Sequence, residues 1–271
     1  MAATQTMVMA NGCALRIGDT RKGDCAVVLL HGYLESLEVW DEFTPLLSRR
    51  LRVVTLDLPG HGVSEVKGPV HTMEFMADTV AEAVAELGIE KFLVAGHSMG
   101  GYVALELLRK YPGRLTGVVL LNSTPNADGE AKKEARLREI ELIDQGKKEL
   151  IARVNAEKRF AADNLTRFAD QIEELTEQVV LTEDEGVKAA LRGMMERRDN
   201  NGMMRASAVP QLVIFGRKDE HITVETAMKV IEAQPQAQVV WLDLSGHMGF
   251  IEESEKCAAA ILDFAAQVCE K

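Results

Sequence analysis

The stretch FLVAGHSMGGYVALELL, residues 92–108, places a serine between two glycines where an apolar run meets a helical pattern. FLVA is typical of a buried strand, and the helical pattern that follows ends at a Pro-Gly pair. Gly96 and Gly100 permit a tight turn and a close approach of backbones, so that the Ser98 side chain projects from the turn. In this strand–turn–helix context, G-x-S-x-G predicts a nucleophilic serine. The alternative is an ordinary serine that caps the helix.

Short apolar runs recur along the chain, with helical patterns between them. Runs this short, β-branched and nearly free of polar residues are typical of strands buried on both faces. The runs are AVVLL (26–30), RVVTL (52–56), FLVA (92–95), GVVLL (117–121), QLVIFG (211–216) and VVWLDL (239–244). Before them, MVMA and CALRIG flank Asn11-Gly12, a pair that suits a two-residue hairpin turn. The sequence therefore predicts an α/β fold with a mostly parallel central sheet of about eight strands, flanked by helices.

The alternation of strands and helices stops between residues 125 and 208. This segment is rich in Glu, Lys, Arg and Ala and shows no convincing strand pattern. Amphipathic patterns predict helices in EAKKEARLREIELIDQG, KKELIARVNAEKRFA, LTRFADQIEELTEQVV and EGVKAALRGMMERRD. Because the strand pattern resumes at Gln211, we expect one core domain, residues 1–124 and 209–271, with an all-helical insertion, residues 125–208, after the sixth strand.

Charge and composition limit the partners of this chain of 271 residues. Its formal net charge of −11 argues against a nucleic-acid backbone or an anionic membrane as the main partner. No apolar stretch approaches the roughly 20 residues that span a bilayer, and no signal-peptide pattern is present. The four cysteines, Cys13, Cys25, Cys257 and Cys269, form no C-x-x-C pair, so we expect reduced thiols in a cytoplasmic protein. His and Cys show no metal-binding pattern, and we expect neither a metal nor a cofactor.

A serine hydroxyl needs a base near neutral pH, and the base needs a carboxylate to orient it. His247 follows the last strand pattern, between Gly246 and Gly249, and Asp219 follows the strand pattern QLVIFG. Both therefore lie at carboxyl ends of strands, where ligands bind in open α/β sheets. The order Ser98, Asp219, His247 is the nucleophile–acid–base order expected for this architecture. Considered alone, His247 could be a solvated loop histidine, and Asp219 alone could be a turn residue.

Two backbone N–H groups are expected to stabilise the oxyanion that forms when the serine attacks a carbonyl. Met99, the residue after the candidate nucleophile, supplies one of them. LLHGYLES (29–36) follows an early strand, and we assign the N–H of Tyr33 as the second donor, with His31 and Gly32 shaping the turn. A role for His31 as a base is the alternative, but its place at a strand end favours a structural hydrogen bond.

Five motifs together resemble the α/β-hydrolase fold superfamily: HGYLES, DLPGHGVS (57–64), GHSMGG (96–101), GRKDEHI (216–222) and SGHMGFIEES (245–254). The resemblance covers nearly the whole chain and puts the helical insertion in the position of that superfamily's cap or lid. It implies Ser98, Asp219 and His247 as the triad and Tyr33 and Met99 as oxyanion donors. One departure is that His221 lies beside the acid, where it could compete for hydrogen bonds with Asp219.

A serine at the turn favours attack on a carbonyl. We therefore expect a carboxylesterase-like enzyme that cleaves a small ester, lactone or thioester through an acyl-enzyme on Ser98. Relatives with a carboxylate nucleophile, the haloalkane dehalogenases and epoxide hydrolases, fit poorly. A carbon–carbon bond hydrolase or a menaquinone-pathway-type lyase of the same fold is an alternative. A ligand receptor or signalling protein on a hydrolase scaffold, with slow or vestigial turnover, is an alternative of another class.

The helical insertion is expected to shape the substrate pocket. Its methionines, Met194, Met195, Met203 and Met204, suit an adaptable apolar pocket, although a seam between cap and core is the more ordinary explanation. Its arginines are Arg153, Arg159, Arg167, Arg192, Arg197 and Arg198, and most are expected to face water. We expect a small-molecule substrate with an apolar acyl group, and a monomer or a homodimer.

Overall fold

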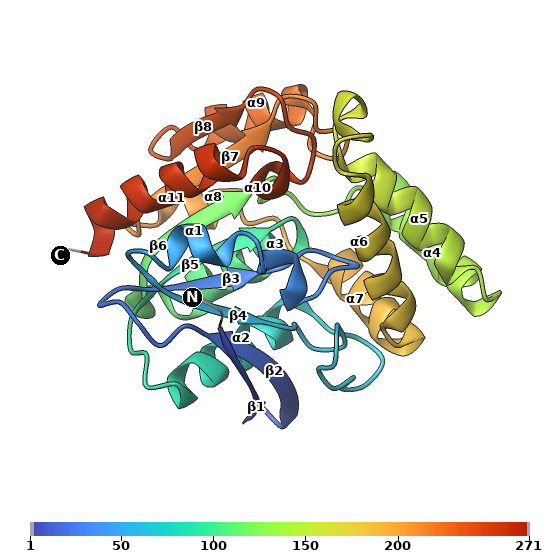
Figure 1. Ribbon diagram of the computed structural model, residues 1–271, viewed down its shortest axis with the longest axis horizontal. Coiled ribbons are helices and arrows are strands. Elements are labelled where there is room, and N and C mark those ends of the chain that lie inside the picture. The colour runs from blue at the N-terminus through green and yellow to red at the C-terminus, as the bar shows by residue number, and fades with distance from the viewer. Residues whose placement is uncertain (1–2, 270–271) are drawn as a thin grey trace.

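The computed structural model describes residues 3–269, and within this range eight strands form one sheet in the order β1-β2-β4-β3-β5-β6-β7-β8 (Figure 1). The strands are β1 (Thr4–Ala10), β2 (Cys13–Asp19), β3 (Ala26–Leu30), β4 (Arg52–Leu56), β5 (Phe92–His97), β6 (Leu115–Leu121), β7 (Gln211–Gly216) and β8 (Gln238–Leu242). β1 pairs with β2 and β2 with β4 in antiparallel fashion, whereas every pair from β4 to β8 is parallel. The predicted mostly parallel sheet is confirmed.

The backbone of the first turn and the burial of the central strands explain the sequence patterns. Asn11 and Gly12 both have positive φ, 50° and 68°, and connect β1 to β2 by a two-residue turn, as the Asn-Gly pair predicts. In β5, successive side chains alternate between two hydrophobic clusters, with Phe92 and Val94 in one and Leu93 and Ala95 in the other. A strand that is buried on both faces must be apolar at every position, and this is why the central runs contain almost no polar residue.

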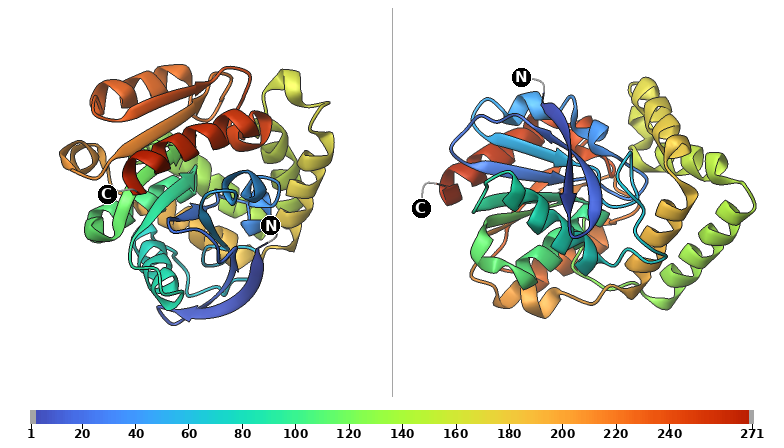
Figure 2. Two further views of the ribbon diagram at one scale, coloured as in Figure 1. Left: turned by 60° about the vertical axis from the view of Figure 1, so that its left-hand side comes forward. Right: turned by 90° about the horizontal axis from the view of Figure 1, so that it is seen from below.

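Helices cover both faces of the sheet (Figures 1 and 2). On one face, apolar side chains of α2, α3, α8 and α9 join the first cluster, and on the other those of α1, α10 and α11 join the second. These helices are α1 (Thr44–Leu47), α2 (Met73–Glu86), α3 (Met99–Lys110), α8 (Asn201–Ala206), α9 (Val224–Ala233), α10 (Gly249–Glu252) and α11 (Ser254–Cys269). Short 3-10 helices lie at η1 (Leu37–Trp40), η2 (Pro112–Arg114) and η3 (Ala162–Asn164). Trp40 is buried with Phe43 and Phe250 and is not among the residues that line the cavity described below.

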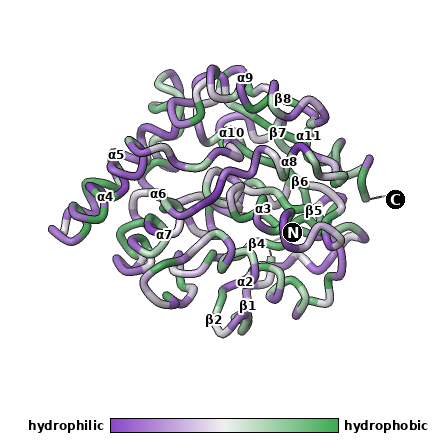
Figure 3. Tube along the Cα trace, turned by 180° about the vertical axis from the view of Figure 1, so that it is seen from behind, coloured by the Kyte–Doolittle hydropathy of each residue, from purple (hydrophilic) through white to green (hydrophobic). Residues whose placement is uncertain are grey.

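A helical cap follows β6, as the sequence predicts. It comprises α4 (Glu130–Asp144), α5 (Lys148–Arg159), α6 (Ala169–Leu181) and α7 (Asp184–Glu196), and the short α8, which packs against α3 and α9 of the core, ends the inserted segment. Figure 2 shows α4–α7 standing to one side of the sheet, and Figure 3 shows more hydrophilic colour on α4 and α5 than on the central strands. Of the predicted core domain, residues 1–2 and 270–271 lie outside the described range. Among residues 3–269, no helix is both long and apolar enough to cross a bilayer.

The helix α7 packs closely against the core at two glycines. Gly186 and Gly193 lie on the same face, and a Cβ atom there would come within 2.1 Å of the Gly60 carbonyl oxygen and 1.7 Å of the His71 carbonyl oxygen, respectively. The His71 N–H also donates a hydrogen bond to the Ala189 carbonyl oxygen at 3.0 Å. Only glycine allows backbones to approach this closely, so α7 is docked tightly against the loop that follows β4.

One expectation about the cysteines is wrong. Cys25, just before β3, and Cys269, at the end of α11, form a disulfide with their Cα atoms 5.9 Å apart. Cys13 and Cys257 are free and buried, as expected of reduced thiols. The bonded pair is separated by 244 residues, and only the packing of α11 beside the sheet brings its members together. Spacing along the chain therefore carries no signal for this bond.

The disulfide predicts the number of reactive thiols. In protein purified without reductant and unfolded in guanidinium chloride, a thiol reagent should titrate two groups, Cys13 and Cys257, and four after reduction. Reduction should also lower Tm, because a disulfide commonly contributes about 2–4 kcal/mol to the free energy of unfolding. Four reactive thiols before reduction would contradict the bond.

Candidate active site

Ser98 occupies the sharp turn between β5 and α3. Its backbone is strained, with φ 48° and ψ −111°, a conformation rarely adopted by residues with a side chain. The flanking glycines make the turn possible, because a Cβ atom at Gly96 would lie 2.2 Å from the Gly100 carbonyl oxygen, and one at Gly100 equally close to the Leu30 carbonyl oxygen. Ser123 Oγ donates a hydrogen bond to the Ser98 carbonyl oxygen at 2.7 Å. Close backbone packing at the two glycines and the hydrogen bond from Ser123 therefore fix the turn. The Ser98 side chain lines a cavity.

His247 and Asp219 meet beside this turn. Asp219 follows β7, His247 follows β8, and His247 Nδ1 lies 2.8 Å from Asp219 Oδ2. Burial favours the neutral form of each group, and it lowers the pKa of His247 although Asp219 opposes that shift. The pKa of Asp219 is held below its usual range despite burial, because His247 and the hydrogen bonds from the Ile222 N–H and Asn122 stabilise the carboxylate. The pair therefore consists of a carboxylate and a histidine that is neutral near pH 7.

Asn122 is a partner of this pair that sequence reasoning missed. It follows β6, and its Nδ2 atom donates to Asp219 Oδ2 at 2.9 Å and to the Gly246 carbonyl oxygen at 3.1 Å. One side chain therefore holds both the carboxylate and the loop that carries His247. Its place directly after a strand of the sheet, like that of Asp219, is the signal that could have identified it.

His221 does not compete for the carboxylate through its ring. Its backbone N–H donates to Asp219 Oδ1 at 2.7 Å, beside the N–H of Ile222 at 2.9 Å. The His221 ring centroid lies 4.7 Å from that of His247. His221, two residues after the acid, therefore supports Asp219 through its main chain, while its ring lines the cavity.

The loop after β3 carries His31, Gly32 and Tyr33. The buried ring of His31 donates from Nδ1 to the Gly32 carbonyl oxygen at 2.7 Å and accepts at Nε2 from the Leu58 N–H at 2.9 Å. Both ring nitrogens are thus occupied by backbone groups. Leu34 has a positive φ of 59°, which turns the chain sharply after Tyr33. Met99 is the first residue of α3, and its N–H is one of those that a helix start leaves without an intrahelical partner.

Glu35 links this loop to the histidines at the centre of the site. It is 3% exposed, accepts from the Gly32 N–H at 2.6 Å, and lies 3.0 Å from His97 Nδ1. His97 Nε2 in turn lies 3.0 Å from the carbonyl oxygen of His247. Burial works to raise the pKa of Glu35, but His97, Arg159 and the Gly32 N–H outweigh it and hold this pKa at about 2. The result is a buried carboxylate beside the loop of Tyr33.

Arg159, at the end of α5, connects the cap to both loops of the core. Its guanidinium pairs with Glu35 at 3.3 Å, and Nη2 donates to the Tyr33 carbonyl oxygen at 2.6 Å. Its own carbonyl oxygen accepts from the N–H groups of His247 at 2.6 Å and Met248 at 3.2 Å. Arg159 is 6% exposed, unlike the solvent-facing cap arginines that the sequence suggests. Because Glu35 and Arg159 are 124 residues apart, no local pattern pairs them.

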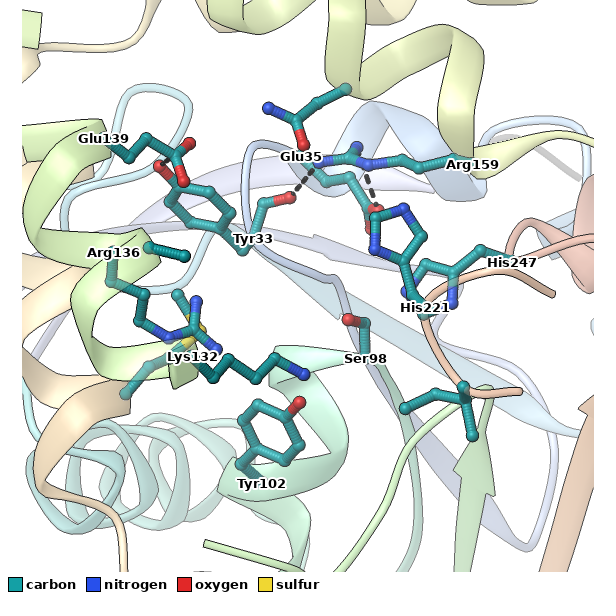
Figure 4. A pocket seen from close by; sticks show the side chains of 14 residues that line it. Tyr33, Glu35, Ser98, Tyr102, Lys132, Arg136, Glu139, Arg159, His221 and His247 are labelled. Carbon is teal, nitrogen blue, oxygen red and sulfur yellow. Dashed lines mark hydrogen bonds and ion pairs between the residues drawn. The ribbon is translucent and has the colours of Figure 1, made fainter. Parts of the chain in front are cut away.

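Ser98, His247, Glu35 and Arg159 line a cavity of about 250 Å³ between core and cap (Figure 4). It is lined by Tyr33, Glu35, Ser98, Tyr102, Lys132, Ala135, Arg136, Glu139, Asn155, Arg159, Met194, His221, Ile222 and His247. Of the four cap methionines only Met194 contributes to this lining; Met204 belongs to the first hydrophobic cluster, and Met195 and Met203 pack against that cluster. Lys132, Arg136 and Tyr102 were not anticipated from the sequence. The lining is richer in polar and charged groups than the apolar pocket that the methionines suggest.

Comparisons with known proteins identify the fold family of this chain. A family model described as the alpha/beta hydrolase fold matches residues 26–254. A dihydrolipoyllysine-residue acetyltransferase component of an acetoin cleaving system from Pseudomonas putida is 31% identical over 90% of this chain, which spans 64% of that protein's length. A pimeloyl-[acyl-carrier protein] methyl ester esterase from Yersinia enterocolitica is 27% identical, covering 91% of this chain and 95% of its own. A thermophilic esterase structure from Thermogutta terrifontis, described as malate bound, has a TM-score of 0.92 and 31% identity, covering 98% of this chain and 99% of its own.

Proposed function

The chain belongs to the alpha/beta hydrolase fold family and is an esterase-like hydrolase, and on that premise we propose that it cleaves small carboxylic esters through an acyl-enzyme on Ser98. The observation that carries this proposal is that Ser98, on its strained turn, and the hydrogen-bonded pair of His247 and Asp219 line or adjoin one cavity. A nucleophile, a base and an orienting carboxylate are the groups that acyl transfer requires.

In the first stage, Ser98 Oγ attacks the ester carbonyl while His247 removes its proton. Because His247 Nδ1 faces Asp219, its hydrogen is held there and Nε2 is left to accept the proton. The carboxylate then stabilises the imidazolium, which donates its new proton to the departing alkoxide. In the second stage, His247 takes a proton from a water molecule that attacks the acyl-enzyme. It then returns this proton to Ser98 Oγ as the bond between Ser98 and the acyl group breaks and the carboxylic acid departs.

The backbone N–H groups of Tyr33 and Met99 are proposed to bind the oxyanion of both tetrahedral intermediates. Removing one such donor typically costs about 2.7–4 kcal/mol of transition-state stabilisation. The contact of Arg159 with the Tyr33 carbonyl oxygen fixes the peptide on the far side of that residue. We therefore assign Arg159 as a positioning residue and treat residues 125–208 as a cap subdomain that helps to order the loops of the core.

Trapping the acyl-enzyme tests the proposal. Rapid mixing with p-nitrophenyl acetate should give a burst of one p-nitrophenolate per chain, followed by steady turnover. Acid quenching during turnover should yield protein heavier by one acetyl group, located by peptide mapping on Ser98. Acetylation at another residue, or no acetylation with any small ester, would contradict the proposal. A burst without steady turnover would favour the receptor-like alternative.

A further inference from the structure

The cavity has an excess of positive charge on the side formed by α4. Lys132 and Arg136 are one helical turn apart on α4 and both line the cavity. Figure 4 shows the Lys132 side chain extending past Tyr102, with its amine turned toward Ser98. Arg136 is 9% exposed, so its charge lies almost wholly within the protein. The formal net charge of the protein is −11, so the charge of Lys132 and Arg136 on this side of the cavity is opposite in sign to that of the whole protein.

The carboxylates on the side of the cavity formed by α4 do not cancel this charge, and Asp219, which is hydrogen-bonded to His247 at 2.8 Å, does not line the cavity. Asp128 is shared by two guanidiniums, those of Arg136 at 2.6 Å and Arg197 at 2.7 Å, which leaves one positive charge in excess. Glu35 is already paired with Arg159 at 3.3 Å.

The remaining carboxylate, Glu139, accepts a hydrogen bond from the Tyr33 hydroxyl at 2.9 Å. Burial raises its pKa, although Tyr33, Arg136 and Arg159 oppose the shift, so it contributes less negative charge than a solvated carboxylate. Within residues 3–269, no carboxylate lies within 4.0 Å of Lys132 Nζ. Its neighbour Lys133, by contrast, pairs with Glu130 at 3.0 Å.

From this charge distribution, and resting on the proposed function, we propose that the preferred substrate is an ester that carries a free carboxylate, held by Lys132 and Arg136 while its ester carbonyl lies at Ser98. An ammonium–carboxylate hydrogen bond is charge-assisted, and a cavity partly closed to water strengthens it. The excess positive charge also attracts an anion from solution. A neutral ester would not form this charge-assisted hydrogen bond with the Lys132 amine.

Two pairs of esters test this substrate class, and in each pair methylation of the free carboxylate removes its charge and creates a second ester. Monomethyl succinate and dimethyl succinate place the carboxylate, or its neutral ester, on the acyl side of the bond that is cleaved. Acetoxyacetate and its methyl ester place it on the alcohol side. The measured quantity is the ratio of kcat/KM for the anionic ester to that for the neutral ester, counted per ester bond for the succinates and by release of acetate for the acetoxyacetates. We expect this ratio to exceed about tenfold in at least one pair, and that pair identifies the side that carries the carboxylate.

Matched variants assign the preference to its residue. Lys132→Met should lower the ratio by about tenfold, because the charge-assisted hydrogen bond is lost. Lys133→Met removes the same charge from the adjacent position on α4 and should leave the ratio within about twofold of the wild-type value. Raising the ionic strength should reduce the wild-type ratio, since Lys132 is accessible to solvent and its attraction is screened by salt.

The outcomes separate this inference from the proposed function. Equal or better turnover of the neutral esters, or an unchanged ratio in Lys132→Met, would overturn the carboxylate preference while leaving the esterase intact. Failure to hydrolyse any of the four esters, together with no acetylation of Ser98 by p-nitrophenyl acetate, would overturn both. Failure with the four esters despite acetylation of Ser98 would overturn only the carboxylate preference.

Discussion

Replacing Ser98 by alanine should lower kcat for small esters by about 10⁶-fold, the loss typical of removing a nucleophile that acts together with a base. The Asp219–His247 pair and the backbone donors would remain, but the hydrolysis they support is slow without an acyl-enzyme. The variant should fold normally, because alanine and serine bear the same strain at φ 48°. Turnover is measured with p-nitrophenyl acetate, Tm by thermal unfolding, and covalent capture with a fluorophosphonate, which should no longer label the protein.

Ser207→Ala is the matched control for this variant. Ser207 lies at the end of α8 and is not among the residues that line the cavity, so its loss should leave kcat within about twofold of the wild-type value. If Ser98→Ala retains more than about a tenth of the wild-type kcat, Ser98 is not the nucleophile.

The core of this fold follows from local chemistry, and for that reason it could be predicted. A parallel strand covered on both faces must be apolar throughout, so runs such as 26–30 and 211–216 identify β3 and β7 without knowledge of their partners. A turn that brings the Gly96 and Gly100 backbones into contact needs glycine at both positions. Strand ends then gather at one edge of the sheet, which is how Asp219 and His247 come to be neighbours.

The side chains with which the cap contacts the core could not be predicted, because these contacts join segments that are distant in sequence. The amphipathic patterns predict α4–α7, but a pattern does not tell which polar residue of a helix faces the core. Arg159 resembles the other cap arginines in sequence, yet its guanidinium is buried against Glu35 and the Tyr33 carbonyl oxygen. Lys132 and Lys133 are adjacent on α4, and only their placement over the core puts one in the cavity and the other in a surface ion pair.

Asp219→Asn should lower kcat by about 10⁴-fold by changing the tautomer of His247. The N–H groups of His221 and Ile222 both donate to Oδ1 of Asp219, and an asparagine there keeps these bonds by placing its carbonyl oxygen at that position. Its amide group then faces His247 Nδ1, which must accept a hydrogen bond rather than donate one. The ring hydrogen moves to Nε2, and His247 loses the site that would take the proton of Ser98.

The same substitution should move the pH dependence in a definite direction. His247 acts as a base when neutral, so kcat/KM rises with pH as its imidazolium loses a proton. Burial lowers the pKa of His247 and the charge of Asp219 opposes this, so removing that charge lowers the pKa further. The acidic limb of the kcat/KM profile should therefore lie at lower pH in Asp219→Asn than in the wild-type enzyme. Both profiles are measured with one small ester.

Asp243→Asn is the control that distinguishes the specific effect of the Asp219 carboxylate from that of losing any one negative charge. Asp243 also follows a strand, β8, but it is exposed and pairs with Arg217 at 3.2 Å and Lys256 at 3.0 Å. Its substitution should change kcat by no more than about twofold and leave the acidic limb in place. A large loss in Asp243→Asn combined with a small one in Asp219→Asn would mean that Asp243 orients the base. That result requires a movement of His247 away from Asp219, because their side chains are 2.8 Å apart in this structure.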